Sequence, residues 1–244
     1  MTRWIVAIAV ALVALASTAE ATAQRGSSSV GRVDNGRLGR GARLRNQGPG
    51  WSVLPEHRAR GRTFAVAQLV RAIRRVARRV RRRHRGSVIT LGDMSQREGG
   101  RISHHISHQS GRDVDVAFFV TGRGRGSPQV RSFVPFDRNL RSMTDGGRIR
   151  FDVPRNWTLV ESLLADGGIQ VQYIFVADYV RQALLEHART HRRAPRLVAR
   201  ARRVLRSTGT SAVHRDHFHV RVYCPPDDMP RCVDTGAVWP WVNR

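Results

Sequence analysis

The stretch HRDHFHVRVY, residues 214–223, has the alternation of a β-strand. Its polar positions from the middle onward are His217, His219 and Arg221. The residues between and after them are aromatic or aliphatic. Successive side chains of a strand point to opposite faces of a sheet, so one face of this strand is polar and the other apolar. The sequence therefore predicts a strand that carries two histidines on one face and packs its other face against a core.

Further strands and helices follow one another irregularly along the chain. Patterns typical of strands cover residues 87–93, 113–120, 131–137 and 171–177. Apolar residues at helical spacing cover residues 64–85, 156–164, 178–190 and 195–206. We expect residues 131–137 to form an edge strand, because Pro135 has no N–H to donate to a neighbour. This irregular order predicts an α+β fold with a central, mostly antiparallel sheet flanked by helices.

The two ends of the chain differ in composition from its middle. Residues 1–23 contain Arg3, an apolar run and an A-x-A site, the pattern of a secretory signal peptide that is cleaved after Ala23. Residues 24–47 are rich in Gly, Ser and Arg and predict a flexible basic linker. Residues 48–244 are expected to form one folded domain.

The charge of the chain is strongly positive, and all of its basic side chains other than histidine are arginine. The formal net charge is +25, and there is no lysine. The missing lysine excludes Ser-x-x-Lys acyl-enzyme chemistry, the phosphate-binding lysine of a P-loop and Schiff-base mechanisms. The arginines of helix 64–85 are open to two interpretations, a solvated face or a surface that binds polyanions.

The two cysteines, Cys224 and Cys232, lie shortly after the last predicted strand. In an exported protein we expect them to form a disulfide that closes a small loop. The alternative is a pair of free buried thiols. A zinc knuckle is not expected, because no second pair of cysteines completes a four-ligand site.

A second cluster of polar residues, SHHISHQSGRDVDV at 103–116, complements the strand at 214–223. His217 and His219 lie two apart, so their rings project from one face about 6.5–7 Å apart. A turn at Gly111 would bring His108 against Asp115. Imidazole and carboxylate donors from two separate segments are what a catalytic zinc site requires. The alternative is that these residues are merely structural, with the aspartates paired to arginines.

Three motifs carry a resemblance to a known family: LGDMSQREGG at 91–100, SHHISHQSGRDVDV and HRDHFHVRVYCP. They resemble the penicillin-insensitive murein endopeptidases, periplasmic zinc enzymes of the superfamily that includes lysostaphin-type peptidases and D-Ala-D-Ala dipeptidases. The resemblance covers roughly residues 48–233. It implies Zn²⁺ bound by His108, Asp115 and His219.

The resemblance also implies roles for further residues. His217, which can accept a proton from water, and His214 would be catalytic. His105 corresponds to a histidine associated with a second metal position. Asp152 is a candidate partner for it, but Arg155 stands where another imidazole is expected. On the residues alone, Asp113 shares a strand face with Asp115 and could orient a ligand.

The function implied is that of a zinc-dependent D,D-endopeptidase in the periplasm. It would cleave D-alanine to diaminopimelate cross-links between peptidoglycan stem peptides, without inhibition by β-lactams. The positive charge would favour an anionic cell-wall polymer or membrane surface, and no specific nucleic acid is expected. One alternative is a D,D-carboxypeptidase or dipeptidase of the same superfamily, with Asp216 as its base. The other is an exported polyanion-binding protein with a non-catalytic metal site.

Overall fold

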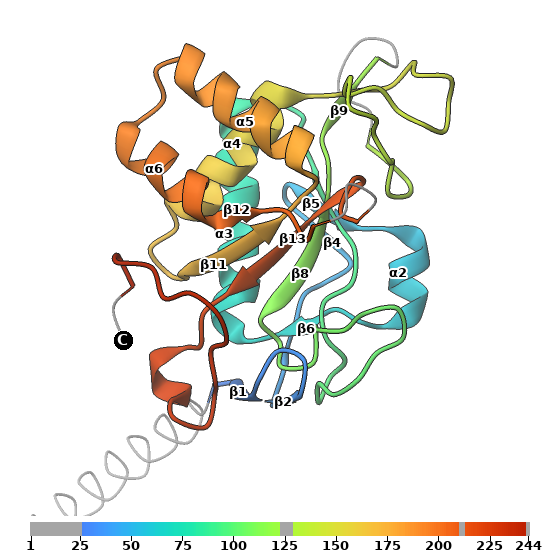
Figure 1. Cartoon of the computed structure of the whole chain (residues 1–244). Coiled ribbons are helices and arrows are strands. Elements are labelled where there is room, and N and C mark those ends of the chain that lie inside the picture. The colour runs from blue at the N-terminus through green and yellow to red at the C-terminus, as the bar shows by residue number, and fades with distance from the viewer. Residues whose placement is uncertain (1–25, 123–128, 210–212, 243–244) are drawn as a thin grey trace, which may run out of the picture.

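A seven-stranded sheet forms the centre of the computed structural model, which describes residues 26–122, 129–209 and 213–242 (Figure 1). Its strands are β4 (Gln47–Gly48), β5 (Trp51–Val53), β7 (Ile89–Leu91), β8 (Asp113–Ala117), β11 (Val171–Phe175), β12 (Leu205–Arg206) and β13 (His217–Val222). They lie in the order β12-β11-β13-β8-β7-β5-β4. Among these described strands, only β11 with β12 and β5 with β7 are parallel. The predicted α+β fold with a mostly antiparallel sheet is confirmed.

Four helices pack together beside this sheet: α3 (Ala67–Arg83), α4 (Val153–Leu164), α5 (Asp178–Thr190) and α6 (Pro195–Val204). Helix α4 lies between α3 and the α5–α6 pair (Figure 1). The apolar side chains of α3 and those of β13 belong to one buried core, with Trp157 of α4 completely buried within it. A shorter helix, α2 (Pro55–Arg60), and a 3-10 turn, η1 (Pro226–Asp228), lie outside this group. Every helix of the described residues is too short or too polar to span a bilayer.

The N-terminal segment is folded, and the prediction of a flexible linker is wrong for residues 26–47. It forms a hairpin of β1 (Ser28–Gly31) and β2 (Gly36–Gly39), and then β3 (Ala42–Arg43), which pairs with β6 (Phe64–Ala65). Val33, Leu38 and Leu44 are at most 3% exposed. A few single aliphatic residues are enough to fold this segment, because they are buried against residues that come later in the chain.

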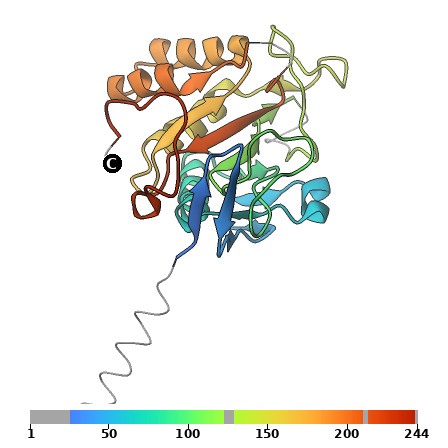
Figure 2. The same cartoon turned by 60° about the horizontal axis from the view of Figure 1, so that its bottom comes forward.

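The C-terminal loop closes over this hairpin. Cys224 and Cys232 form the predicted disulfide. The backbone of Gly31 bonds Arg231 and Val233 on either side of Cys232. Figure 2 shows the blue hairpin beside the red loop that follows β13. The two ends of the described chain therefore stabilise each other, which a flexible N-terminal segment could not do.

One predicted strand is absent from the described part of the structure, and one predicted helix begins earlier than expected. Residues 131–137 do not form a strand. Instead Phe136 bonds the backbone of Arg215, and β9 (Val120–Thr121) pairs with β10 (Arg150–Phe151). Helix α4 begins at Val153 with Asp152 as its N-cap, because the amide of Asn156 bonds both backbone groups of Phe119 instead of capping the helix.

Candidate metal centre

His108 lies in the loop before β8 in a backbone conformation that is rare for a residue with a side chain. Its φ is 69°, and it is completely buried. Nδ1 of His108 lies 3.2 Å from the carbonyl oxygen of Met94, and the hydroxyl of Ser95 donates to the carbonyl oxygen of His108. Gly111 follows with φ of 76° and makes the predicted turn. The loop therefore holds the imidazole with Nδ1 as donor and Nε2 free to face Asp115.

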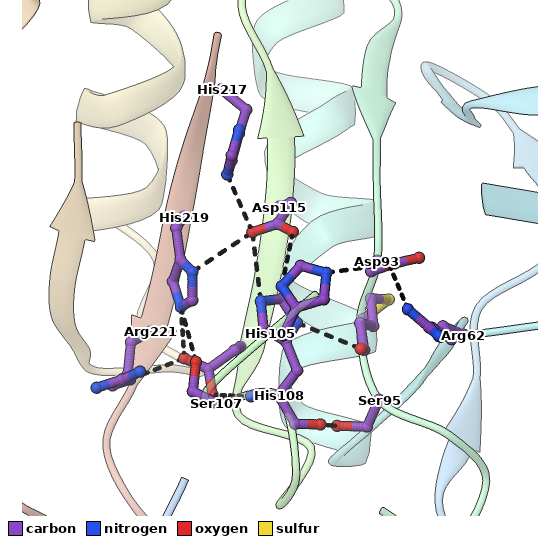
Figure 3. A network of polar contacts seen from close by, with 12 residues as sticks. Arg62, Asp93, Ser95, His105, Ser107, His108, Asp115, His217, His219 and Arg221 are labelled. Atoms are coloured by element: carbon purple, nitrogen blue, oxygen red, sulfur yellow. Dashed lines mark hydrogen bonds and ion pairs between the residues drawn. The ribbon is translucent and has the colours of Figure 1, made fainter. Parts of the chain in front are cut away.

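The carboxylate of Asp115 is the centre of the cluster. Its Oδ1 lies 3.3 Å from His108 Nε2, 3.5 Å from His219 Nδ1 and 3.5 Å from His217 Nε2 (Figure 3). Its Oδ2 lies 3.8 Å from Nδ1 of His105. Both oxygens of Asp115 are buried without a hydrogen-bond donor, and so is His108 Nε2. The two predicted histidine clusters thus meet at one carboxylate.

The pairing of β8 with β13 determines which side chains meet. His219 stands opposite Asp115, and Arg221 stands opposite Asp113. Asp113 Oδ1 accepts from His219 Nε2 at 2.8 Å and from Arg221 Nε at 2.7 Å. With Nε2 bound to Asp113, Nδ1 of His219 is the nitrogen left to face Asp115. Asp113 therefore holds the ring of His219, and the sequence had indicated Asp113 as a residue that could orient a ligand.

His217 lies at the start of β13 and is held from two sides. Its Nδ1 lies 2.6 Å from Asp216 Oδ1, and its ring stacks on Phe133 with centroids 4.5 Å apart. These contacts direct Nε2 toward Asp115 (Figure 3). An imidazole with a carboxylate on one nitrogen and the other nitrogen directed at a metal centre can accept and return protons there.

His214 completes the ring of imidazoles before β13. Its ring lies 5.2 Å from that of His217 and 5.5 Å from that of His219, and Phe175 stacks on it. Burial, followed by the neighbouring imidazoles, lowers the pKa of His214 to about 3. The side chain is therefore neutral at ordinary pH and can donate one hydrogen bond from one ring nitrogen.

His105 lies on the outer side of the same cluster. Its Nε2 lies 3.1 Å from Asp93 Oδ2, and its ring centroid lies 4.3 Å from that of His108. Asp93 is fully buried and also contacts His57 and Arg62. His57 and Arg62 thus fix the carboxylate of Asp93, and Asp93 in turn positions the ring of His105. His105, His108 and Asp115 offer donor atoms within 4.8 Å of one another, a group that could hold a metal ion.

Asp152, the candidate partner of His105 for a second metal, has another task in the structure. Its Oδ1 accepts from the backbone N–H of Arg155, and its Oδ2 pairs with the guanidinium of the same residue at 3.3 Å. Asp152 therefore caps helix α4. The structure brings His105 to the first metal cluster and gives Asp152 no place in it.

The two carboxylates of the cluster stay ionised although they are buried. Burial alone would raise the pKa of Asp115, but His108 and His217 hold it well below its ordinary value. Burial acts in the same direction on Asp113, yet Arg221 and His219 lower the pKa of that carboxyl as well. Two ionised carboxylates are thus buried side by side on β8. Buried charges of this kind are normally paired or bound to a metal.

The donor set fits a zinc ion. Four ligands at ~2.0–2.1 Å around a tetrahedral ion lie about 3.3–3.4 Å from one another. The two distances from Asp115 Oδ1, 3.3 Å to His108 and 3.5 Å to His219, are close to that spacing. Two imidazoles and one carboxylate are a usual ligand set for a catalytic zinc with one open position.

Comparison with known proteins agrees with the resemblance drawn from the motifs. The sequence model of the family described as penicillin-insensitive murein endopeptidase matches residues 29–240. The chain belongs to this family. The match includes residues 29–47 and so agrees with a folded N-terminal segment.

Individual members of the penicillin-insensitive murein endopeptidase family are similar to the chain over most of its length. The member from Klebsiella pneumoniae is 29% identical over 212 residues, and that from Salmonella paratyphi C is 32% identical over 212 residues. Both alignments cover 85% of this chain and 70% of the relative. The member from Yersinia enterocolitica is 32% identical over 177 residues, and the alignment spans 71% of this chain and 58% of that protein.

Several residues that support the metal centre could not be recognised from their spacing. Asp93 lies in the family motif at 91–100 but was assigned no role, and its partner His57 lies in a separate helix. Phe133, which stacks on His217, lies in a segment predicted as a strand. For Asp93, the available signal was its place at the end of the predicted strand 87–93 and within the family motif.

Proposed function

We propose that the chain is a zinc-dependent D,D-endopeptidase that cleaves D-alanine to diaminopimelate cross-links in peptidoglycan and is not inhibited by β-lactams. The observation that carries the proposal is the convergence of His108 and His219 on one oxygen of Asp115. Family membership supports a peptidase that acts on murein. The absence of lysine argues against the Ser-x-x-Lys active site, whose serine β-lactams acylate.

His108, Asp115 and His219 would hold the zinc. When bound, the ion lowers the pKa of water and polarises the scissile carbonyl. His217 would accept a proton through Nε2, with Asp216 fixing the ring through Nδ1. Neutral His214 would donate a hydrogen bond to the oxygen of the scissile carbonyl as negative charge develops there. His105 would add a donor at the edge of the cluster, either to this ion or to a second one.

The D,D-carboxypeptidase or dipeptidase alternative needs Asp216 to act as the base. In the structure Asp216 Oδ1 lies 2.6 Å from His217 Nδ1, so the carboxylate faces the imidazole. This contact favours His217 as the proton acceptor and Asp216 as the residue that orients it. Release of free D-alanine would favour the alternative, whereas conversion of cross-linked dimers to monomers favours the endopeptidase.

The polyanion-binding alternative relied on the arginines of helix 64–85. Arg75 and Arg79 pair with the buried Asp166, and Arg83 pairs with Glu161. Part of that charge therefore serves to attach α3 to its neighbours. A non-catalytic metal site also gives no use for His217, whose Nε2 faces Asp115 while its Nδ1 is held by Asp216.

Export to the periplasm belongs to the same proposal. The residues of the expected signal peptide, 1–23, lie outside the described residues. The disulfide between Cys224 and Cys232 is consistent with an oxidising compartment. Substrate in the cell wall would require the same location.

The test uses purified protein and cross-linked muropeptide dimers. Wild-type protein should convert dimers to monomers, lose this activity with a chelator and keep it with a β-lactam. Its metal content should be about one zinc per chain, and His219→Ala should lose both the metal and the activity. His191→Ala is the matched control, because His191 is exposed at the end of α5. Intact dimers after incubation with zinc-loaded wild-type protein would overturn the proposal.

A further inference from the structure

The helix pair α5–α6 carries an excess of positive charge that the fold does not neutralise. From Glu186 to Arg206 there are eight arginines and one acidic residue. Both helices lie next to each other at the surface, away from the N-terminal hairpin (Figures 1 and 2). So many like charges on two short helices raise the free energy of the unbound surface, and a bound polyanion would lower it.

The arginines line a continuous hollow on this helix pair. One cavity of about 490 Å³ is bordered by Arg189, Arg192, Arg193 and Arg202, over a floor that includes Val198. A neighbouring cavity of about 770 Å³ shares Arg189 and Arg202 with it. Because the two cavities share two residues, they form one groove. This hollow is called the α5–α6 groove below.

Several guanidinium groups in the α5–α6 groove have no carboxylate partner. Arg189 pairs with Glu186, and Arg181 pairs with Asp178. For the other exposed arginines that line the groove, no ion pair is formed within the described part of the chain. These residues are Arg138, Arg192 and Arg202. Guanidinium forks of this kind match carboxylate groups in two-point contacts.

Hydrogen bonds connect one side of the groove to the segment that precedes β13. Tyr179, which lines its second cavity, donates its hydroxyl hydrogen to the carbonyl of Phe136. The N–H of Phe136 in turn bonds the carbonyl of Arg215 at 2.9 Å, two residues before His217. A polymer in the groove would therefore reach the side of the molecule on which β13 begins.

The apolar side chains that line the groove, such as Leu185 and Val198, are only partly exposed and do not project as membrane-inserting groups do. The large hydrophobic side chains that are well exposed lie outside α5 and α6: Ile106, Met143, Val213, Met229, Val233 and Val238. Surface helices that bind membranes usually present aromatic or aliphatic side chains together with their basic residues. A concave, charged groove instead fits an extended, water-soluble strand.

We propose that the α5–α6 groove is an exosite that binds the free carboxylates of uncleaved stem peptides along the same peptidoglycan strand. The proposal rests on the proposed endopeptidase function, because it takes the substrate polymer as the partner. Peptidoglycan repeats carboxylates on its stem peptides, and the groove repeats guanidinium groups along two helices. Binding there would keep the metal centre near further cross-links after each cleavage.

The test compares two charge-matched triple variants in binding to isolated sacculi, measured by sedimentation on ice before hydrolysis proceeds. Arg138→Gln, Arg192→Gln and Arg202→Gln remove charge from the groove. Arg78→Gln, Arg81→Gln and Arg82→Gln remove the same charge from exposed positions of α3. The groove variant should bind about tenfold more weakly than wild type, and the α3 variant within about twofold of it. The difference should shrink at high salt, because exposed charges are screened.

Two further arms identify the partner. Sacculi whose carboxylates have been amidated should bind the wild type and the groove variant equally. Equal loss in both variants, or a groove effect that persists on amidated sacculi, would overturn the proposal. So would groove-dependent binding to phosphatidylglycerol vesicles without such binding to sacculi. Cleavage of soluble dimers by the wild type is measured separately, so that failure of the endopeptidase function is not mistaken for failure of the exosite.

Discussion

Asp115 and His219 are direct partners across β8 and β13, and Oδ1 of the first lies 3.5 Å from Nδ1 of the second. The next pair along the same face is Asp113 with Arg221. Two adjacent strands therefore place two carboxylates opposite an imidazole and a guanidinium. A shift of one residue in the register would turn the side chains of the shifted strand to the other face of the sheet and separate them from their partners. The candidate metal centre thus depends on the pairing of two strands that lie about a hundred residues apart in sequence.

The first prediction concerns Asp113, which accepts hydrogen bonds from His219 and Arg221. Asp113→Asn should weaken metal binding about 10–100-fold, because loss of such an outer hydrogen bond leaves the ligand ring less well oriented. Competition with a chromophoric chelator measures the change. Asp34→Asn is the control, since the carboxylate of Asp34 pairs with the exposed Arg32 and with none of the histidines of the cluster among the described contacts. Unchanged metal affinity in Asp113→Asn would show that His219 does not need this partner.

Asp216 should affect turnover and leave metal binding intact. Its carboxylate holds Nδ1 of His217 at 2.6 Å. We expect Asp216→Ala to lower kcat about 10–100-fold with an unchanged metal content, because a proton acceptor must be held in place. Asp216→Asn should lose less, since its amide oxygen can accept the same hydrogen bond. Cleavage rates on muropeptide dimers and the metal content of the same samples are measured together. If Asp216→Ala also lost its metal, Asp216 would be needed for metal binding and not only for orienting His217.

Gly111 should not tolerate a side chain. Its φ is 76°, and a Cβ atom there would lie 2.6 Å from Leu38 Cδ1 and 3.1 Å from the backbone nitrogen of Val66. Gly111→Ala should therefore lower the free energy of unfolding by about 2–3 kcal/mol, part from backbone strain and part from the clash. Gly146→Ala provides the control, because Gly146 has φ of 70° with open space around it. Chemical denaturation gives the loss of unfolding free energy in both variants, and the difference between the two losses measures the clash. Equal losses would show that the added Cβ at Gly111 does not clash.

Much of the fold and of the metal centre could be predicted from local patterns. The alternation in β13 correctly assigned His217 and His219 to one face, and Gly111 correctly marked the turn that brings His108 to Asp115. These patterns depend on the few residues on either side, which a sequence shows directly. Asp113 shares a strand face with Asp115, as the alternation predicted, and there it contacts His219.

Contacts between distant segments could not be predicted in this way. Asp93 receives its partners from α2 and from the loop of His105, and no spacing along the chain indicates that meeting. Leu38 and Leu44 stand among arginines and glycines, so their composition indicated a linker. Leu38 lies against Gly111, and the backbone of Leu44 bonds Thr63, so the segments that enclose both leucines lie later in the chain.

The folded state of the N-terminal segment is directly testable. Leu44 is completely buried, and its backbone bonds Thr63. Leu44→Ala should cost about 2–4 kcal/mol of unfolding free energy, as truncation of a buried leucine usually does. Val238→Ala, at a position that is 50% exposed, should cost little. If residues 26–47 were a flexible tail, denaturation midpoints of both variants would equal that of the wild type.

The acid stability of the protein should depend on Asp166, which joins α3 to the end of α4. Burial alone would raise the pKa of Asp166, but the hydrogen bond from Arg75 and the charge of Arg79 lower it below the ordinary value of 3.8. A carboxyl whose pKa is lower in the folded state stabilises the fold above its unfolded pKa, and that contribution is lost as the pH falls through the folded value. Asp166→Asn should therefore cost about 2 kcal/mol at neutral pH and progressively less in acid, because the wild type loses the same interaction there. Thermal unfolding between pH 7 and strongly acidic pH measures the effect. Asp178→Asn is the control and should change little, because Asp178 forms an exposed ion pair with Arg181. A stability difference that stays constant down to the lowest pH would show that Asp166 acts through packing and not through its charge.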